Sequence, residues 1–188
     1  MHSSIKNYED IIKLIKSKLE EQKINKLPKV IAVSKTFSLD KILPLIEYGH
    51  LDYGENKVQE ATDKWTEIKI KKPKIKLHLI GNLQTNKVKF AIKIFDYIHS
   101  VDSAKLAKKI SDEQIKQNKK VKIFIQVNIG LEEQKSGVEI HEIGELLNFC
   151  NKLNLDVIGL MCIPPINQKS GEYFKKMNSL NKRCNLQE

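Results

Sequence analysis

The chain has 188 residues, of which 40% are hydrophobic and 30% charged. This is the composition of one globular domain, and it excludes a disordered tail, a collagen-like chain, a disulfide scaffold and a large multidomain enzyme. The net charge is 33 − 23 = +10, but Arg183 is the one arginine among the 33 basic residues. The other 32 are lysines spread through every segment, which indicates solvated surfaces and argues against an arginine-based nucleic-acid reader.

Apolar periodicity predicts a first helix, in which an apolar stripe runs from Tyr8 through Ile11, Ile12 and Ile15 to Leu19. Short apolar runs and helical patterns then alternate along the chain. The predicted strands span residues 29–34, 50–53, 75–80, 95–99, 121–128 and 155–161. The predicted helices between and after them span residues 39–48, 58–68, 86–94, 103–117, 138–153 and 173–183.

Each step from one predicted strand to the next fits one βα unit. Continuous apolar strands that alternate with helices indicate a parallel sheet covered by helices, which is an α/β fold. We find no linker, low-complexity stretch or strong internal repeat. The sequence therefore predicts a single domain over residues 1–188, with six βα units preceded by a helix.

The cysteines and the N-terminus indicate where such a protein works. The three cysteines, Cys150, Cys162 and Cys184, are odd in number and form no CxxC pair, which suits a reducing cytosol. The five histidines are scattered, so no metal site is expected. The N-terminal segment lacks the apolar stretch of a signal peptide, and no apolar run approaches the roughly 20 residues of a membrane span. We expect a cytoplasmic protein that contacts no membrane.

Ligands of parallel α/β folds bind at the carboxyl ends of the strands, and Lys35 directly follows the first predicted strand. A lysine in a partly dehydrated site has a lowered pKa, and its neutral amine can then attack a carbonyl to form a Schiff base. The alternative is a lysine at the rim that only extends its charge into solvent.

Four further residues lie at or near strand ends. Strand alternation places His78 on one face with Ile80, where it either lines a pocket or is a hydrogen-bonded core histidine. Asn56 and Asn82 lie close to glycines, so they either form turns or offer amide groups to a ligand. Gly81 would allow the backbone to approach a ligand closely.

These segments together resemble the pyridoxal phosphate homeostasis proteins, also called YggS/PROSC-like proteins. The resemblance covers nearly the whole chain, in order and almost without gaps. The segments that carry it are Ala32-Val33-Ser34-Lys35-Thr36, Gly54-Glu55-Asn56 with Val58-Gln59-Glu60, the stretch from His78 to Lys87 (HLIGNLQTNK), His99-Ser100-Val101-Asp102, Gln126-Val127-Asn128-Ile129, Lys135-Ser136-Gly137 and Gly159-Leu160-Met161.

The resemblance implies a (β/α)8 TIM barrel of the alanine-racemase N-terminal type. It also implies that pyridoxal 5'-phosphate (PLP) is held as a Schiff base on Lys35, with Asn56, His78, Gly81 and Asn82 around the cofactor. The family acts in PLP and vitamin B6 homeostasis without known catalysis, so we expect no catalytic residues and no metal.

The chain departs from the family pattern at its C-terminal end. Family members continue with strands seven and eight, which supply most of the grip on the phosphate, whereas this sequence stops at residue 188. We therefore expect a barrel truncated after about six βα units, as a shortened chain or as a short variant with impaired PLP binding. The resembled family is monomeric, but exposed sheet edges would here favour poor solubility or association with another chain.

Two other functions are kept as alternatives. A PLP-dependent amino-acid racemase would need a second base on the opposite face of the cofactor, and in alanine racemase a separate β-domain supplies it. Nothing in this sequence corresponds to that domain. A basic module that binds nucleic acid rests on the net charge of +10 alone.

Overall fold

A computed structural model describes residues 2–188 and contains six strands and seven α-helices in that range. The strands are β1 (Ala32–Val33), β2 (Asp52–Glu55), β3 (Lys76–Leu79), β4 (Tyr97–Val101), β5 (Lys122–Gln126) and β6 (Asp156–Met161). The helices are α1 (Ser3–Glu21), α2 (Leu39–Glu47), α3 (Val58–Lys71), α4 (Val88–Ile94), α5 (Ala104–Gln117), α6 (Ile143–Lys152) and α7 (Ser170–Arg183). Short 3₁₀ turns at Thr85–Lys87 and Ile140–Glu142 lead into α4 and α6.

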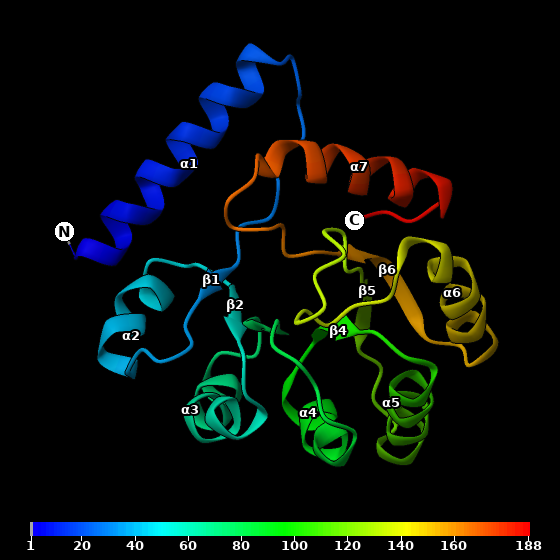
Figure 1. The fold of residues 1–188 in the computed structure, drawn as a ribbon. Helices are drawn as coiled ribbons and strands as arrows, with labels where there is room; N and C mark the ends of the chain where they lie inside the picture. Colours follow the sequence, from blue (N-terminus) through cyan, green and yellow to red (C-terminus); the bar gives the residue numbers. More distant parts are fainter. Residues whose placement is uncertain (1) are drawn as a thin grey trace.

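The six strands form one parallel sheet in the order β1-β2-β3-β4-β5-β6. Each strand pairs with the next one along the chain, as the predicted βα units require. Figure 1 shows the strands as an open arc, with α2 to α6 around its outer side and α1 and α7 near its two ends. The α/β class and the leading helix are thus confirmed.

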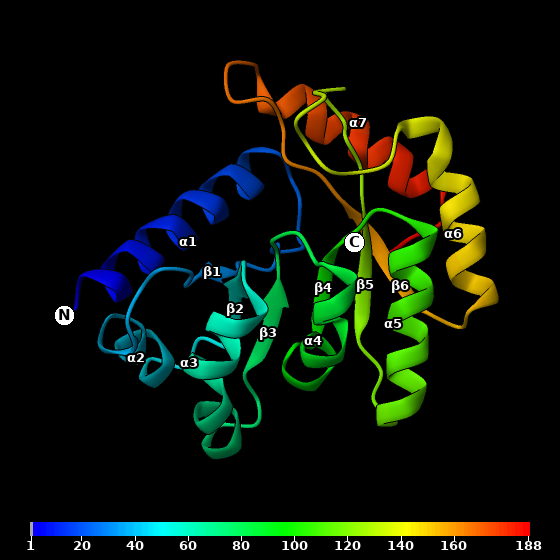
Figure 2. The same ribbon diagram turned by 60° about the horizontal axis from the view of Figure 1, so that its bottom comes forward.

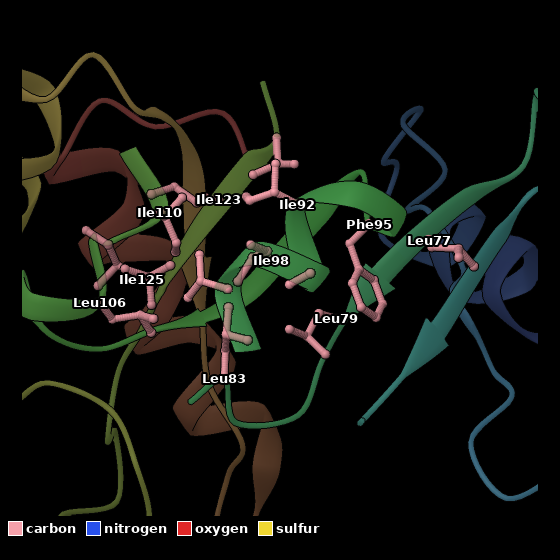
Figure 3. Packing of buried hydrophobic residues seen from close by; sticks show 14 of the residues in the cluster. Leu77, Leu79, Leu83, Ile92, Phe95, Ile98, Leu106, Ile110, Ile123 and Ile125 are labelled. Atoms are coloured by element: carbon pink, nitrogen blue, oxygen red, sulfur yellow. The ribbon is translucent and has the colours of Figure 1, made fainter. Parts of the chain in front are cut away.

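The hydrophobic core lies between the strands and the outer helices. The strand side chains that point outward, such as Leu77, Leu79 and Ile98, are fully buried against helix residues. Figure 3 shows Leu79 and Ile98 packed near Phe95 and Ile92. The alternation in β3 is therefore as predicted, because Leu77 and Leu79 face the helices while His78 and Ile80 face the interior of the arc.

Three strands, β1, β2 and β4, start two or three residues later than the sequence pattern indicates, and the physical reason is the same for β2 and β4. The N–H of His50 still bonds to the carbonyl of Leu45 in the turn after α2, so β2 begins at Asp52. The N–H of Phe95 bonds to the carbonyl of Ala91, so β4 begins at Tyr97. Gly49 has a φ of +102°, and it ends the preceding helical segment as a glycine there is expected to do.

The outer edge of β6 is bonded by the last residues of the chain. The N–H groups of Gln187 and Glu188 donate to the carbonyl of Ile158 at 3.1 and 2.9 Å, and the N–H of Leu160 donates to the carbonyl of Glu188 at 3.3 Å. At the other end of the sheet, Val33 in β1 is 45% exposed. Residues 2–188 thus form an open arc of six strands, and the expected association through its edges stays a prediction. Over the same range, no helix combines the length and the apolar character needed to cross a membrane.

Candidate functional site

A cavity of about 430 Å³ lies at the carboxyl ends of the strands, where a ligand site is expected. Its size lies within the range of about 300–1,000 Å³ that is typical of small-molecule sites. The cavity is lined by residues at or just after the ends of β1, β2, β3, β5 and β6. These are Lys35, Asn56, Ile80, Gly81, Asn82, Gln126, Val127, Asn128, Gln134, Lys135, Ser136, Met161 and Ile163.

Lys35 lines this cavity two residues after the end of β1. Its neighbour Ser34 is buried, and the N–H of Ser34 donates to the carbonyl of Gly54 in β2 at 2.9 Å. Lys35 itself is exposed, so its amine is in contact with solvent. The dehydration expected from the sequence is therefore not present in this structure. The structure does have the amine at the cavity, as expected.

Asn56, Gly81 and Asn82 lie at the ends of β2 and β3 and line the same cavity. Gly81 is required here because its backbone passes directly over Asn56. A Cβ atom at position 81 would lie 2.8 Å from the Cα of Asn56 and closer still to its carbonyl oxygen. Because Gly81 has no side chain, the ends of β2 and β3 can lie close together at one wall of the cavity.

The opposite wall comes from β5 and the loop that follows it, which extends past the strand ends in Figure 2. The amide of Asn128 holds this loop, since its Nδ2 donates to the carbonyl of Glu132 at 2.9 Å and its Oδ1 accepts the N–H of Glu132 at 3.1 Å. The Nε2 of Gln126 donates to the carbonyl of Ser136 at 3.0 Å. The sequence analysis gives Gln126 only as part of a family segment and assigns it no role at the site, although period-2 alternation places Gln126 and Asn128 on one face of the predicted strand 121–128.

Lys135 is a second amine at the cavity, but it is already engaged. Its Nζ lies 2.6 Å from the carboxylate of Glu132 and donates to the carbonyls of Ile163 and Pro164 at 3.4 and 3.2 Å. These contacts fasten the β5–α6 loop to the end of β6. Lys35 therefore differs from Lys135 in having its amine at the cavity without such partners among residues 2–188.

His78 faces the interior, but it does not line this cavity with the other four predicted residues. It borders a larger cavity of about 1040 Å³, which lies toward the amino ends of the strands. There its Nε2 lies 3.0 Å from the carboxylate of Asp52, its Nδ1 lies 2.9 Å from Nε2 of His99, and its ring stacks on Tyr97. Both ring nitrogens are satisfied, which corresponds to the hydrogen-bonded core histidine considered from the sequence.

The groups around His78 have shifted pKa values. Burial, with a smaller contribution from His78, lowers the pKa of His99 to about 3, so its ring is neutral at pH 7. Burial opposes ionisation of Asp52, but the hydrogen bond from His78 and the nearby charge of Lys29 outweigh it and hold the pKa of Asp52 below its usual value. Neither Asp52 nor His99 was identified as a partner of His78 from the sequence.

The chain has relatives among known protein families and curated proteins. The family whose model matches it is described as alanine racemase, N-terminal domain, and the match spans residues 12–185. A pyridoxal phosphate homeostasis protein of Vibrio alginolyticus is 33% identical over 194 residues, which cover 100% of this chain and 81% of the relative. A protein of the same name from Aquifex aeolicus is 38% identical over 156 residues, covering 81% of this chain and 68% of the relative.

Solved structures agree with these sequence matches. PipY of Synechococcus elongatus PCC7942, in a structure described as having PLP bound, has a TM-score of 0.75 and 29% identity, and the match covers 92% of this chain and 81% of PipY. An alanine racemase of Clostridium difficile 630 has a TM-score of 0.62 at 15% identity, covering 94% of this chain and 46% of the racemase. The racemase likeness concerns the fold alone.

Replacing Gly81 by alanine is expected to destabilise the protein. The new methyl group must push apart the ends of β2 and β3, so Gly81→Ala should lower the free energy of unfolding by about 1–3 kcal/mol. Gly144→Ala is the matched control, because a Cβ at Gly144 in α6 meets nothing within 4 Å. It should be neutral or stabilising by up to about 1 kcal/mol. Denaturant unfolding measures both, and equal effects would contradict the close approach at Gly81.

His99 is expected to make stability depend on pH. The folded pKa of about 3 lies below the unfolded value of about 6.5, so below pH 6.5 the unfolded chain binds a proton that the folded chain does not. This contribution destabilises the fold as the pH falls, by about 2 kcal/mol at pH 5. The loss of unfolding free energy between pH 7 and pH 5 should therefore be smaller by about that amount in His99→Gln.

The exposed His141 provides the control for this measurement, as His141→Gln should keep the wild-type pH dependence. If both variants lose stability with pH as the wild type does, His99 is not held neutral by its surroundings.

Proposed function

Because the chain belongs to the pyridoxal phosphate homeostasis proteins, within the alanine racemase N-terminal domain family, we propose that it binds PLP for vitamin B6 homeostasis with Lys35 as the covalent anchor. The observation that carries this proposal is the position of Lys35. Its amine borders the cavity at the strand ends together with Asn56, Gly81 and Asn82. Four of the five residues proposed to contact the cofactor thus lie at one cavity, whereas His78 borders the other cavity.

The residues around the cavity fit the aldehyde and the ring substituents of PLP, whereas strands seven and eight, to which the family resemblance assigns the phosphate, are not among the six strands of residues 2–188. The cofactor supplies an aldehyde that can condense with a primary amine, and the exposed amine of Lys35 can reach such a group. The amides of Asn56 and Asn82 offer both donors and acceptors to polar substituents. Gly81 lets the end of β3 approach the Asn56 backbone, so that both strand ends border the cavity. The volume of about 430 Å³ is sufficient for a small-molecule ligand.

Lys35 would act by reversible covalent capture. Its amine would hold the cofactor through the aldehyde group, whose chemistry is reversible condensation with a primary amine and release of water. The walls from β3 and the β5–α6 loop would border the held group. Asn56 and Asn82 would orient the PLP that Lys35 holds. Residues 1–188 would form the single binding unit in which these steps take place.

We further propose that the chain holds PLP without turning over a substrate. Among the residues lining the cavity in the described range, Lys35 and Lys135 are the two with titratable side chains of acid–base use. Lys135 is held by Glu132 and two carbonyls, so it does not offer a free base. The racemase alternative needs a second base on the opposite face of the cofactor, and no residue lining the cavity in that range supports that role.

The proposal places the protein in the cytosol and includes neither a nucleic-acid nor a membrane partner. The free thiols of Cys150, Cys162 and Cys184 support a reducing compartment. The scarcity of arginine supports the absence of a nucleic-acid role. Association with another chain is assigned to the outer edge of β1, because Gln187 and Glu188 already bond to the outer edge of β6.

Replacing Lys35 by alanine tests the proposed anchor. Added PLP should give the wild type the absorbance band of the lysine–pyridoxal link, and Lys35→Ala should lose that band because its amine is no longer at the cavity. Lys105→Ala, which removes an exposed lysine from α5, should keep it. An unchanged band in Lys35→Ala would disprove the assignment. Turnover of a free amino acid, followed by chiral chromatography, would revive the racemase alternative.

A further inference from the structure

The backbone conformation next to Lys35 needs an explanation. Thr36 has a φ of +64°, which lies in the left-handed region that a β-branched residue rarely adopts. Such a conformation persists only where the surrounding structure holds it in place. Since Thr36 directly follows Lys35, whatever holds Thr36 also determines the direction in which the chain leaves Lys35.

Helix α3 supplies the groups that hold this turn. The N–H of Thr36 donates to Oε1 of Glu60 at 2.8 Å, and Nζ of Lys64 donates to the carbonyl of Ser34 at 2.9 Å. Both backbone neighbours of Lys35 are therefore bound to one helix, by two side chains that are four residues apart. The hydrogen bond from Thr36 also holds the pKa of Glu60 below its usual value, against the smaller effect of burial and with a further contribution from Lys64.

Lys64 is placed to act as a fixed cation rather than as a reactive amine. Its side chain is only 10% exposed, and its three donors find three acceptors. These are the carbonyl of Ser34 at 2.9 Å, Oε1 of Glu55 at 2.9 Å and Oε1 of Glu60 at 3.2 Å. Because every donor of Lys64 is satisfied, its side chain connects the end of β1 with β2 and α3.

Glu55, the last residue of β2, belongs to the same hydrogen-bond network. It is fully buried, and its Oε1 accepts hydrogen bonds from Ser34 Oγ at 2.8 Å, from Lys64 Nζ and from Trp65 Nε1 at 2.9 Å. Because Glu55 also precedes Asn56, the same carboxylate connects the strand end that carries Lys35 with the one that carries Asn56. Glu55 and Lys64 therefore both bond to Ser34, the residue that precedes the proposed anchor.

We infer that Glu60 and Lys64 are positioning residues, which hold Ser34 and Thr36 and thereby fix the direction in which the Lys35 amine meets PLP. This inference rests on the proposed function and deepens it. Neither residue lines the cavity, so both act through the backbone on each side of Lys35. Glu60 acts on Thr36 and Lys64 acts on Ser34.

Glu60 is the better residue to test, since removing Lys64 would leave the buried charge of Glu55 without its cation. Glu60→Ala should raise the dissociation constant for PLP about tenfold, as expected for the loss of a hydrogen bond to a charged group. Glu60→Gln keeps an oxygen that can accept the N–H of Thr36, so it should retain most of the affinity. Glu67→Ala, an exposed change on the same helix, should leave the affinity unchanged.

A second substitution separates positioning from a general loss of structure. Glycine adopts a φ of +64° readily, so in a Thr36→Gly background Glu60→Ala should weaken PLP binding about threefold or less. Hydrogen exchange of the residue 36 amide, measured without PLP, should speed up in Glu60→Ala and stay slow in Glu60→Gln. Denaturant unfolding of each variant confirms that the fold is retained.

The outcomes distinguish this inference from the proposed function. If the wild type shows no capture that depends on Lys35, the proposed function fails and the inference with it. If the wild type captures PLP but Glu60→Ala binds as Glu67→Ala does, the positioning role alone is overturned. If Glu60→Ala weakens PLP binding equally in the wild-type and Thr36→Gly backgrounds, the positioning role is also overturned. Glu60 would then affect PLP binding by a route other than the backbone conformation of Thr36.

Discussion

The arrangement of the site depends on the buried ion pair between Glu55 and Lys64. A carboxylate that is fully buried has a high desolvation cost, and it is retained only where donors and an opposite charge compensate for it. Here three donors converge on one oxygen, and they come from the end of β1 and from two positions of α3. Losing Lys64 would leave the Glu55 carboxylate buried without its cation, which typically costs about 3–5 kcal/mol. The pair therefore fixes how the ends of β1 and β2 meet α3.

The parallel sheet positions the other site residues, because it brings the carboxyl ends of all its strands to one side. Lys35, Asn56, Gly81 and Asn82 are separated along the chain, yet they border one cavity. This much could be predicted from the sequence, since each follows an apolar run and parallel strands end on the same side. The exposure of Lys35 could not, because a strand pattern gives the position of a residue and not the loops that cover it.

His78 illustrates the limit of an alternation pattern. Period 2 correctly placed it on the inner face with Ile80, but it gives no depth along the strand. Two residues correspond to roughly 6–7 Å, and this distance separates the lining of one cavity from that of the other. Ile80 borders the candidate site, while His78 forms its contacts with Asp52 and His99. The family resemblance names such a residue without stating at which depth it acts.

The positioning network could not be predicted at all. Lys64 is one of 32 lysines, and with Glu60 it has the spacing of an ordinary solvated pair on a helix. Only the fold turns that pair toward the end of β1. The left-handed backbone conformation of Thr36 could not be predicted either, because a threonine after a lysine does not indicate a positive φ.

The central claim is that one amine among these lysines captures PLP, because of where the fold places it. The most direct measurement is borohydride reduction of the protein with PLP at equal concentrations, followed by peptide mapping with mass spectrometry. The account predicts that the pyridoxyl phosphate mass lies on the peptide that contains Lys35. A label spread over many lysines, or concentrated on a different one, would contradict it.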